Sequence, residues 1–173
     1  MKAKALFLLA VGIGILAVSP LFALDSEMNR ATLKGLRGVR VLVEDLAPEV
    51  EREGLVKDQI QKSIEERLRQ AEIKVLTQEE AMKVPGEPYL YVNININFAK
   101  GAEVCSYSID AALIQNVTLV RSPKQTTYAV TWSTGGVGLV AKKSLPKARK
   151  IRCWTDSMCV GRIIMAMLSV TRA

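Results

Sequence analysis

The chain has 173 residues, of which 49% are hydrophobic and 24% are charged, and its formal net charge at pH 7 is +7. This composition is typical of a globular protein and excludes a chain that is disordered throughout. The sequence contains no histidine. Serine–histidine and cysteine–histidine catalysis are therefore excluded, and so is any zinc site that needs an imidazole ligand.

The charges are unevenly distributed along the chain. Residues 24–98 carry 11 basic and 14 acidic side chains, whereas residues 99–173 carry 11 basic and 3 acidic ones. The C-terminal half is therefore the part that we expect to meet an acidic partner.

Residues 1–23 have the order of regions that is typical of a secretory signal peptide. Two lysines come first, an uninterrupted apolar run follows over residues 5–18, and a small residue, Ala23, ends the segment. We predict cleavage after Ala23 and a periplasmic or secreted mature protein. The alternative is an uncleaved segment 5–22 that anchors the chain in the inner membrane, although this run is short for a membrane-spanning helix.

The remainder has a normal size for one domain. We expect residues 24–35 to form a flexible N-terminal segment and residues 36–173 to form a single α+β domain. A chain of this length buries roughly 70% of its unfolded surface, so its core needs neither a metal nor a disulfide.

The first part of this domain predicts two strands and two helices. Residues 36–44 are rich in valine with period two, which predicts a strand. From Leu55 to Ala71 apolar residues recur every three or four positions, which predicts an amphipathic helix. Residues 73–76 predict a short strand, and the capping box at Thr77–Glu80 predicts the start of a short helix.

Two long strands are predicted next. Residues 89–98 alternate between apolar and polar side chains, which is typical of a strand with one buried face. Residues 104–121 continue with period two, and their length predicts a bulge near Gln115-Asn116.

The chain then predicts a return strand and a final helix. Residues 126–134 form the strand, with Tyr128, Val130 and Trp132 toward the core, and the glycine-rich run 135–138 ends the sheet. A stripe of apolar residues after Ser144 predicts a second long helix. The fold class is therefore predicted as α+β: a two-layer sandwich of a mostly antiparallel sheet with two main helices on one face.

Several short motifs of this chain recur together in one group of proteins. They are Leu36-Arg37-Gly38-Val39, Gly54-Leu55, Arg67-Leu68-Arg69-Gln70-Ala71 with Ile73-Lys74-Val75-Leu76, Pro88-Tyr89-Leu90-Tyr91-Val92-Asn93, Gln115-Asn116-Val117 and Thr131-Trp132-Ser133-Thr134-Gly135. With these motifs the chain resembles uncharacterised exported bacterial proteins over about residues 33–140. Glu72 departs from their pattern by replacing a glycine, and Val56 by replacing a capping threonine. The resemblance implies a fold similar to small α/β domains of cell-envelope assembly proteins, and it supplies no catalytic residues.

The densest basic cluster is the candidate site for an anionic partner. It comprises Lys142, Lys143, Lys147, Arg149, Lys150 and Arg152. Anionic lipid headgroups or an acidic protein can bind such a cluster, whereas nucleic acid is disfavoured because no aromatic residues are interleaved. The alternative interpretation is a solvated loop and helix face.

Two further patterns concern ligand binding. Asn93, Asn95 and Asn97 share one face of their strand with two tyrosines, which suits a glycan or a peptide, or is simply the wet side of a sheet. The run from Gly136 to Ala141 matches the dinucleotide pattern G-x-G-x-x-A, but too few residues follow for the rest of a nucleotide fold. We therefore predict no cofactor, and no metal.

Three cysteines, Cys105, Cys153 and Cys159, remain in a chain predicted to reach an oxidising compartment. We interpret them as buried small apolar residues, with a thiol redox role as the alternative.

These observations predict a non-catalytic periplasmic or cell-envelope binding or assembly module. The first alternative is an envelope-surface protein that binds anionic lipid or an acidic partner through the basic segment 142–152, and the second is a thiol redox protein. The expected partner is an envelope protein or an anionic surface. Exposed strand edges also allow self-association into a homo-oligomer.

Overall fold

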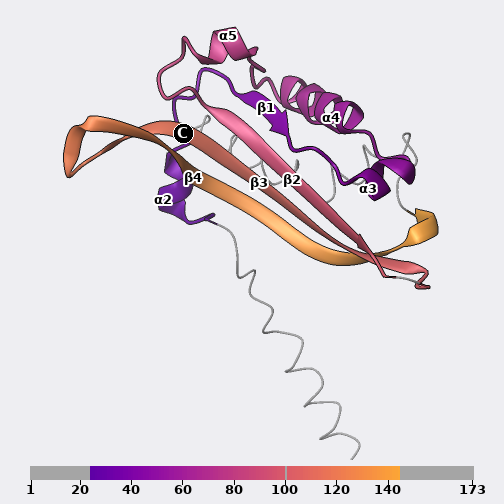
Figure 1. The fold of residues 1–173 in the computed structure, drawn as a ribbon. Coiled ribbons are helices and arrows are strands. Elements are labelled where there is room, and N and C mark those ends of the chain that lie inside the picture. Colours follow the sequence, from indigo (N-terminus) through magenta and orange to yellow (C-terminus); the bar gives the residue numbers. More distant parts are fainter. Residues whose placement is uncertain (1–23, 100, 145–173) are drawn as a thin grey trace, which may run out of the picture.

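The computed structural model describes residues 24–99 and 101–144. Its centre is a mixed sheet of four strands in the order β1 (Arg40–Val43), β2 (Tyr89–Phe98), β3 (Val104–Leu119) and β4 (Ser122–Ala141) (Figure 1). β1 pairs with β2 in parallel, and the other two pairings are antiparallel. This sheet and its helices confirm the predicted α+β class.

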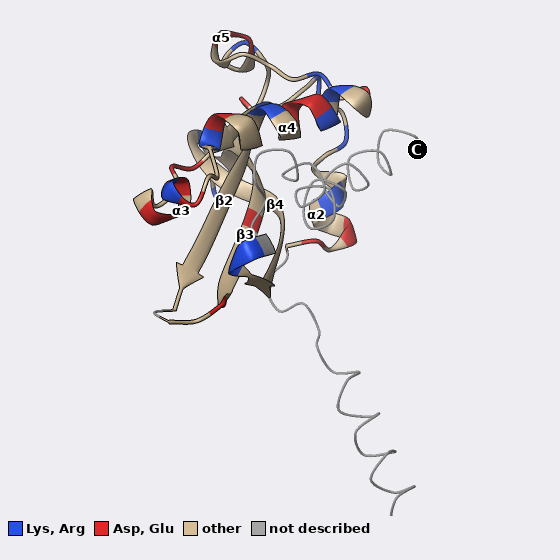
Figure 2. Ribbon diagram, turned by 90° about the vertical axis from the view of Figure 1, so that its right-hand side faces the viewer, with Lys and Arg blue, Asp and Glu red and all other residues tan. Residues whose placement is uncertain are grey.

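Helices lie near both edge strands of this sheet. They are α2 (Glu27–Ala31), α3 (Pro48–Arg52), α4 (Lys57–Gln70), α5 (Gln78–Ala81) and the 3-10 turn η1 (Lys142–Ser144). α4 contacts β1, and α2 contacts β4 (Figure 1). α4 is one of the two main helices that the sequence predicts, and the other lies outside the described residues. Charged residues are concentrated on the helices, whereas the strands are mostly uncharged (Figure 2).

One face of the sheet carries the hydrophobic core. The helical period of α4 places Ile60, Ile64 and Leu68 on one stripe, and each is at most 1% exposed. The strands supply every second residue to the same core, for example Leu90 and Val92 from β2. Full burial of each such side chain stabilises the fold by about 1.5–3 kcal/mol relative to exposure.

The N-terminal residues 24–35 belong to the folded structure, which corrects the expectation of a flexible segment. The side chain of Ser26 caps α2, and Leu33 is 2% exposed within the core. The expectation was wrong because no side chain of α2 is buried. The helix therefore has no apolar periodicity in the sequence that would predict it.

The first predicted strand is shorter than expected, and the second is a single contact. Regular pairing covers only β1, and Val39 before it forms an isolated parallel bridge to Val75. The Val39 amide donates to the Lys74 carbonyl at 2.9 Å, and the Leu76 amide donates to the Val39 carbonyl at 3.0 Å. Residues 73–76 therefore cover the start of the β1 edge without forming a strand.

The capping box at Thr77–Glu80 is confirmed. The Thr77 hydroxyl accepts from the Glu80 amide at 3.2 Å, while the Glu80 carboxylate accepts from the Thr77 amide at 2.9 Å. These reciprocal bonds satisfy two main-chain donors that the first turn of α5 would leave free.

The predicted bulge exists, but the extra residue lies in β4. Leu113 pairs with Trp132 and Ile114 pairs with Val130, so Thr131 is the extra residue of the bulge and has no paired residue in β3. One extra residue reverses the alternation of a strand. Trp132 is therefore fully buried, whereas Tyr128 and Val130 are 53% and 44% exposed, which corrects their predicted place in the core.

The glycine-rich run does not end the sheet. Gly135, Gly136 and Gly138 lie inside β4, opposite Asp110, Ile109 and Tyr107 of β3. The prediction was wrong because glycine carries no apolar period, whereas here the register with β3 extends the strand to Ala141. The loose G-x-G-x-x-A match is thus a stretch of strand rather than the strand-to-helix turn that holds a pyrophosphate.

The two departures from the resemblance coincide with the two ends of α4. Val56 is the N-cap residue and makes no side-chain capping bond. Glu72, just after the C-cap Ala71, has a φ of 62°, in the left-handed region that favours glycine. Both ends of the helix are therefore less stable than they would be with threonine and glycine.

Within the part of the chain that the structure describes, no helix is both long and apolar enough to cross a membrane. The predicted signal peptide lies outside the described residues.

Candidate functional site

Among the described residues, the face of the sheet that points away from the core is exposed and carries a row of polar side chains. β2 presents Asn93, Asn95 and Asn97 there, and the paired positions of β3 present Ser106 and Ser108. These residues line a groove of about 840 Å³.

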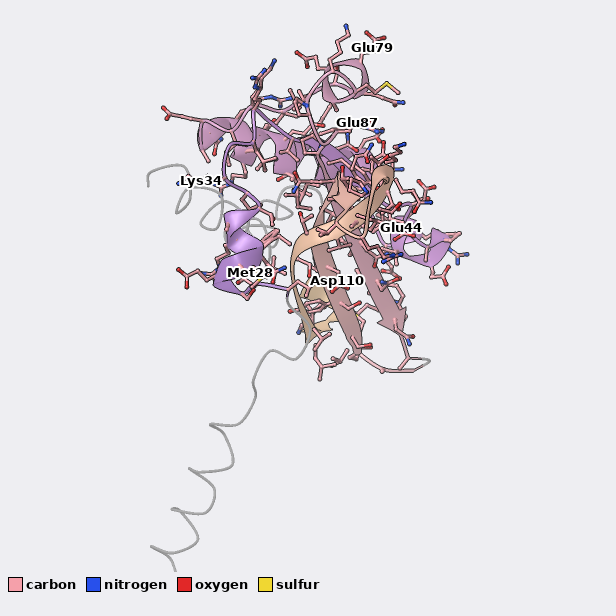
Figure 3. All side chains as sticks on the ribbon, turned by 90° about the vertical axis from the view of Figure 1, so that its left-hand side faces the viewer. Met28, Lys34, Glu44, Glu79, Glu87 and Asp110 are labelled. Carbon is pink, nitrogen blue, oxygen red and sulfur yellow. The ribbon has the colours of Figure 1, made fainter. Side chains whose placement is uncertain are left out.

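The groove has one acidic wall and one apolar wall. Glu44 and Asp45, which follow β1, lie on the first side, and Val137 and Leu139 of β4 lie on the second. Figure 3 shows Glu44 and Met28 of α2 on opposite sides of the sheet. α2 therefore lies on the side of the sheet opposite to the groove.

A chain of hydrogen bonds runs along the acidic side of the groove. The side-chain amide of Asn95 donates to the side-chain oxygen of Asn93. The side-chain amide of Asn93 in turn donates to the Glu44 carboxylate. The Tyr91 hydroxyl donates to the same carboxylate at 2.5 Å. The bonds all run toward Glu44, so this carboxylate fixes the orientation of both neighbours.

Glu44 also shifts the pKa of Tyr91 upward. The hydrogen bond to the carboxylate, together with some burial and the negative charge, raises the pKa of Tyr91 from 10.0 to about 12. Tyr91 keeps its proton at neutral pH, as any tyrosine with an ordinary pKa does, and donates to Glu44; the raised pKa extends this protonated range to more alkaline pH. The arrangement can hold a ligand by hydrogen bonds, and it does not produce a phenolate near neutral pH.

The sequence identified the asparagine row but not its acidic partner. Glu44 reaches the row because its amide donates to the Val92 carbonyl at 2.9 Å and continues the parallel pairing of β1 with β2. Strand pairing across 49 positions of sequence brings Glu44 to Asn93. No local pattern indicates such a contact, since a glutamate at a strand end is usually a solvated residue.

The structure places only part of the predicted basic cluster. Lys142 and Lys143 lie in η1, while Lys147, Arg149, Lys150 and Arg152 lie outside the described residues.

Lys142 is held by the fold. Its ammonium lies 2.9 Å from the Glu53 carboxylate and 5.6 Å from the centre of the Phe98 ring. The hydrogen bond to Glu53 raises the pKa of Lys142. This lysine therefore already has an acidic partner inside its own chain.

Cys105 lies in the core as the sequence predicts. It is 2% exposed and free, and its thiol donates to the Val140 carbonyl at 3.4 Å. Burial raises the pKa of the Cys105 thiol, so the thiolate that redox chemistry needs is disfavoured. Cys153 and Cys159 lie outside the described residues.

Within residues 24–99 and 101–144, no three histidine, cysteine, aspartate or glutamate residues are grouped so that they could hold a metal ion.

The comparisons with known proteins give structural likeness only. No protein-family model matches the chain, and no curated protein matches it. Two solved structures of PelC dodecamers from Paraburkholderia phytofirmans are similar to it. A point variant has 16% identity and a TM-score of 0.43, covering 78% of this chain and 92% of that one. The second has 14% identity and a TM-score of 0.41, covering 77% and 91%. Likenesses at this level carry no conclusion about what this chain does or how it assembles.

Proposed function

We propose that this chain is a non-catalytic binding or assembly module of the cell envelope, and that it binds its ligand in the open-face groove. The observation that carries the proposal is the hydrogen-bond chain from Asn95 through Asn93 to Glu44, joined there by Tyr91. Side chains fixed in this way bind a ligand with little further loss of rotamer freedom.

The chemistry of the groove favours a ligand rich in hydrogen-bonding groups. Amide and hydroxyl side chains cover its floor, and Val137 and Leu139 supply an apolar wall. Pockets that combine an apolar surface with a few placed polar groups are the usual binding sites of proteins. Export to the envelope is part of the proposal because residues 1–23 have the pattern of a signal peptide.

The test is a capture experiment with a matched control. The chain from Leu24 onward is immobilised and exposed to envelope extract from its source organism. The groove variant carries Asn95→Lys and Asn97→Lys, because both residues are exposed and line the groove. The control carries Gln59→Lys and Gln78→Lys, which make the same chemical change at exposed positions on the helices.

We expect one molecule to be retained by the wild type and the control and to be lost from the groove variant. Equal retention by all three proteins would contradict binding in the groove. Conversion of the retained molecule into a new product would contradict a non-catalytic role.

A further inference from the structure

The outer edge of β4 has unpaired main-chain groups. The Lys142 main-chain amide points inward, toward β3, and donates to the Glu103 carbonyl. The Ser133 main-chain amide points outward, away from β3, and donates to the Leu24 carbonyl at 3.3 Å. The register is regular from Trp132 to Ala141. By alternation the amides and carbonyls of residues 135, 137 and 139 also point outward, and they have no hydrogen-bond partner in the described part of the chain.

The edge already accepts a main-chain partner where one is available. The Leu24 carbonyl accepts from the Ser133 main-chain amide, and the Leu24 amide donates to the Ser133 hydroxyl at 3.1 Å. The Asn29 side chain donates to the Thr131 carbonyl at 3.0 Å. Beyond Ser133 the edge is bare in the described structure. No proline, lysine or bulge protects residues 134–141 from pairing with another strand.

The side chains beside this edge are apolar. Val137 is 82% exposed and Leu139 is 75% exposed, and both point to the open face. A strand added here would place its own side chains directly beside them. Alternate apolar residues in that strand would therefore remove exposed hydrocarbon from water.

An acidic side chain lies beside the same edge, next to Gly135, which is two residues before Val137. Asp110 pairs with Gly135, and its carboxylate oxygen lies 2.5 Å from the position that a Cβ on Gly135 would take. Because Gly135 has no side chain, the carboxylate lies over the main chain of the edge strand. Asp110 is exposed and makes no hydrogen bond or ion pair with any described residue.

We propose that residues 135–139 of β4 bind an extended peptide strand in antiparallel pairing. The peptide carries two apolar residues at alternate positions, opposite Leu139 and Val137, and a basic residue opposite Gly135, beside Asp110. Main-chain hydrogen bonds supply the affinity, and the three side chains supply the selectivity. The proposal goes beyond the groove ligand, because it uses main-chain groups that the Asn95→Lys and Asn97→Lys changes leave in place.

Two synthetic probes test this pairing. The basic probe is the capped peptide Thr-Val-Thr-Val-Thr-Lys-Thr, and the acidic probe has glutamate in place of lysine. Binding of each to the chain from Leu24 onward is measured by fluorescence anisotropy. We expect the basic probe to bind at least tenfold more tightly than the acidic one.

The edge itself is tested by Val137→Pro with Val137→Thr as its control. Proline removes the outward amide hydrogen, which is unpaired in the described structure, and edge strands tolerate proline at such positions. Threonine keeps both the amide and a branched side chain. The proline variant should lose at least tenfold in affinity for the basic probe, and the threonine variant should lose less than threefold.

A charge reversal gives a second test that leaves the backbone unchanged. The Asp110→Lys variant should prefer the acidic probe by at least tenfold.

The proposal is overturned if the wild type binds neither probe, if the Val137→Pro and Val137→Thr variants bind the basic probe equally, or if the Asp110→Lys variant keeps the original preference. Dimerisation of the wild type that the proline change abolishes, without probe binding, would assign the edge to a second copy instead and also overturn it. If the wild type fails to bind the peptide probes but still captures its ligand in the groove experiment, the peptide-binding inference is wrong and the proposed function stands.

Discussion

The sheet ends in two edges that differ in length and in cover. β1 is four residues long, and residues 73–76 and α4 lie against it. β4 is 20 residues long, and among the described residues only Leu24 and Asn29 bond to its outer side, at positions 131–133. Short or covered edges avoid pairing with other chains, whereas a long bare edge invites it. The comparison therefore separates the side of this protein that is built for stability from the side that is available for contact.

The largest expected effect is at the covered part of the β4 edge. Trp132 is fully buried, and its indole donates to Asp25 at 2.8 Å. The Trp132→Ala variant should lose about 3–5 kcal/mol of unfolding free energy, because it leaves a large cavity. Urea unfolding measures the loss. Trp132→Phe keeps most of the buried area and should lose clearly less, and equal losses would show that the hydrogen bond rather than the packing dominates.

At the β1 edge the sensitive position is Gly38. Its φ is 150°, and a Cβ there would lie 2.7 Å from the Lys74 carbonyl oxygen, which is part of the segment that covers the edge. The Gly38→Ala variant should be destabilised by about 1–3 kcal/mol. Gly35→Ala is the control, because Gly35 also has a positive φ but no atom within 4 Å of the added carbon. A smaller loss at Gly38 than at Gly35 would contradict the tight contact.

The start of α4 should be easy to improve. Val56 is the N-cap residue, is 41% exposed and makes no side-chain capping bond. The Val56→Thr variant should gain about 1 kcal/mol, because a hydroxyl can accept a main-chain amide of the first turn. Thermal unfolding with Val56→Ala alongside checks this. A similar gain for alanine would mean that the cap is not the cause.

The end of α4 should respond by a smaller amount. Glu72 has a φ of 62°, a conformation that costs a residue with a side chain about 1–2 kcal/mol. The Glu72→Gly variant should gain up to about 1 kcal/mol, since glycine also loses more freedom on folding. Glu72→Ala removes the charge but keeps the strain, so it should not raise the unfolding midpoint.

The smallest expected effect concerns the open face and appears only at high pH. The raised pKa of Tyr91, about 12 against an ordinary value of 10.0, means that its stabilising contribution is complete below about pH 10 and is lost as the pH rises through about 12. The tyrosinate absorbance should show one late-titrating tyrosine, and Glu44→Gln should bring its pKa down. Glu87→Gln is the matched change, because Glu87 raises the pKa of Tyr128 instead. No change in the Glu44→Gln titration would contradict the proposed hydrogen bond.

Local patterns predicted the elements whose signal lies within a few neighbouring residues. The stripe of α4, the alternation of β2 and the Thr77–Glu80 box each depend on spacings of two to four positions, and the structure confirms all three. The candidate site was only half predictable. The asparagine row follows from alternation, but Glu44 joins it only through pairing of distant strands.

The sequence by itself therefore determined the α+β class, the core stripe and the polar row. Tertiary structure alone decided which way β4 faces and how far it runs. The extra residue at Thr131 reverses the alternation, and the register with β3 carries the glycine-rich run to Ala141. The physical reason is that glycine has no side chain to mark a face, and a bulge is defined by two strands together. The unpaired main-chain edge at Val137 results from the bulge at Thr131 together with the extension of β4 through the glycine-rich run.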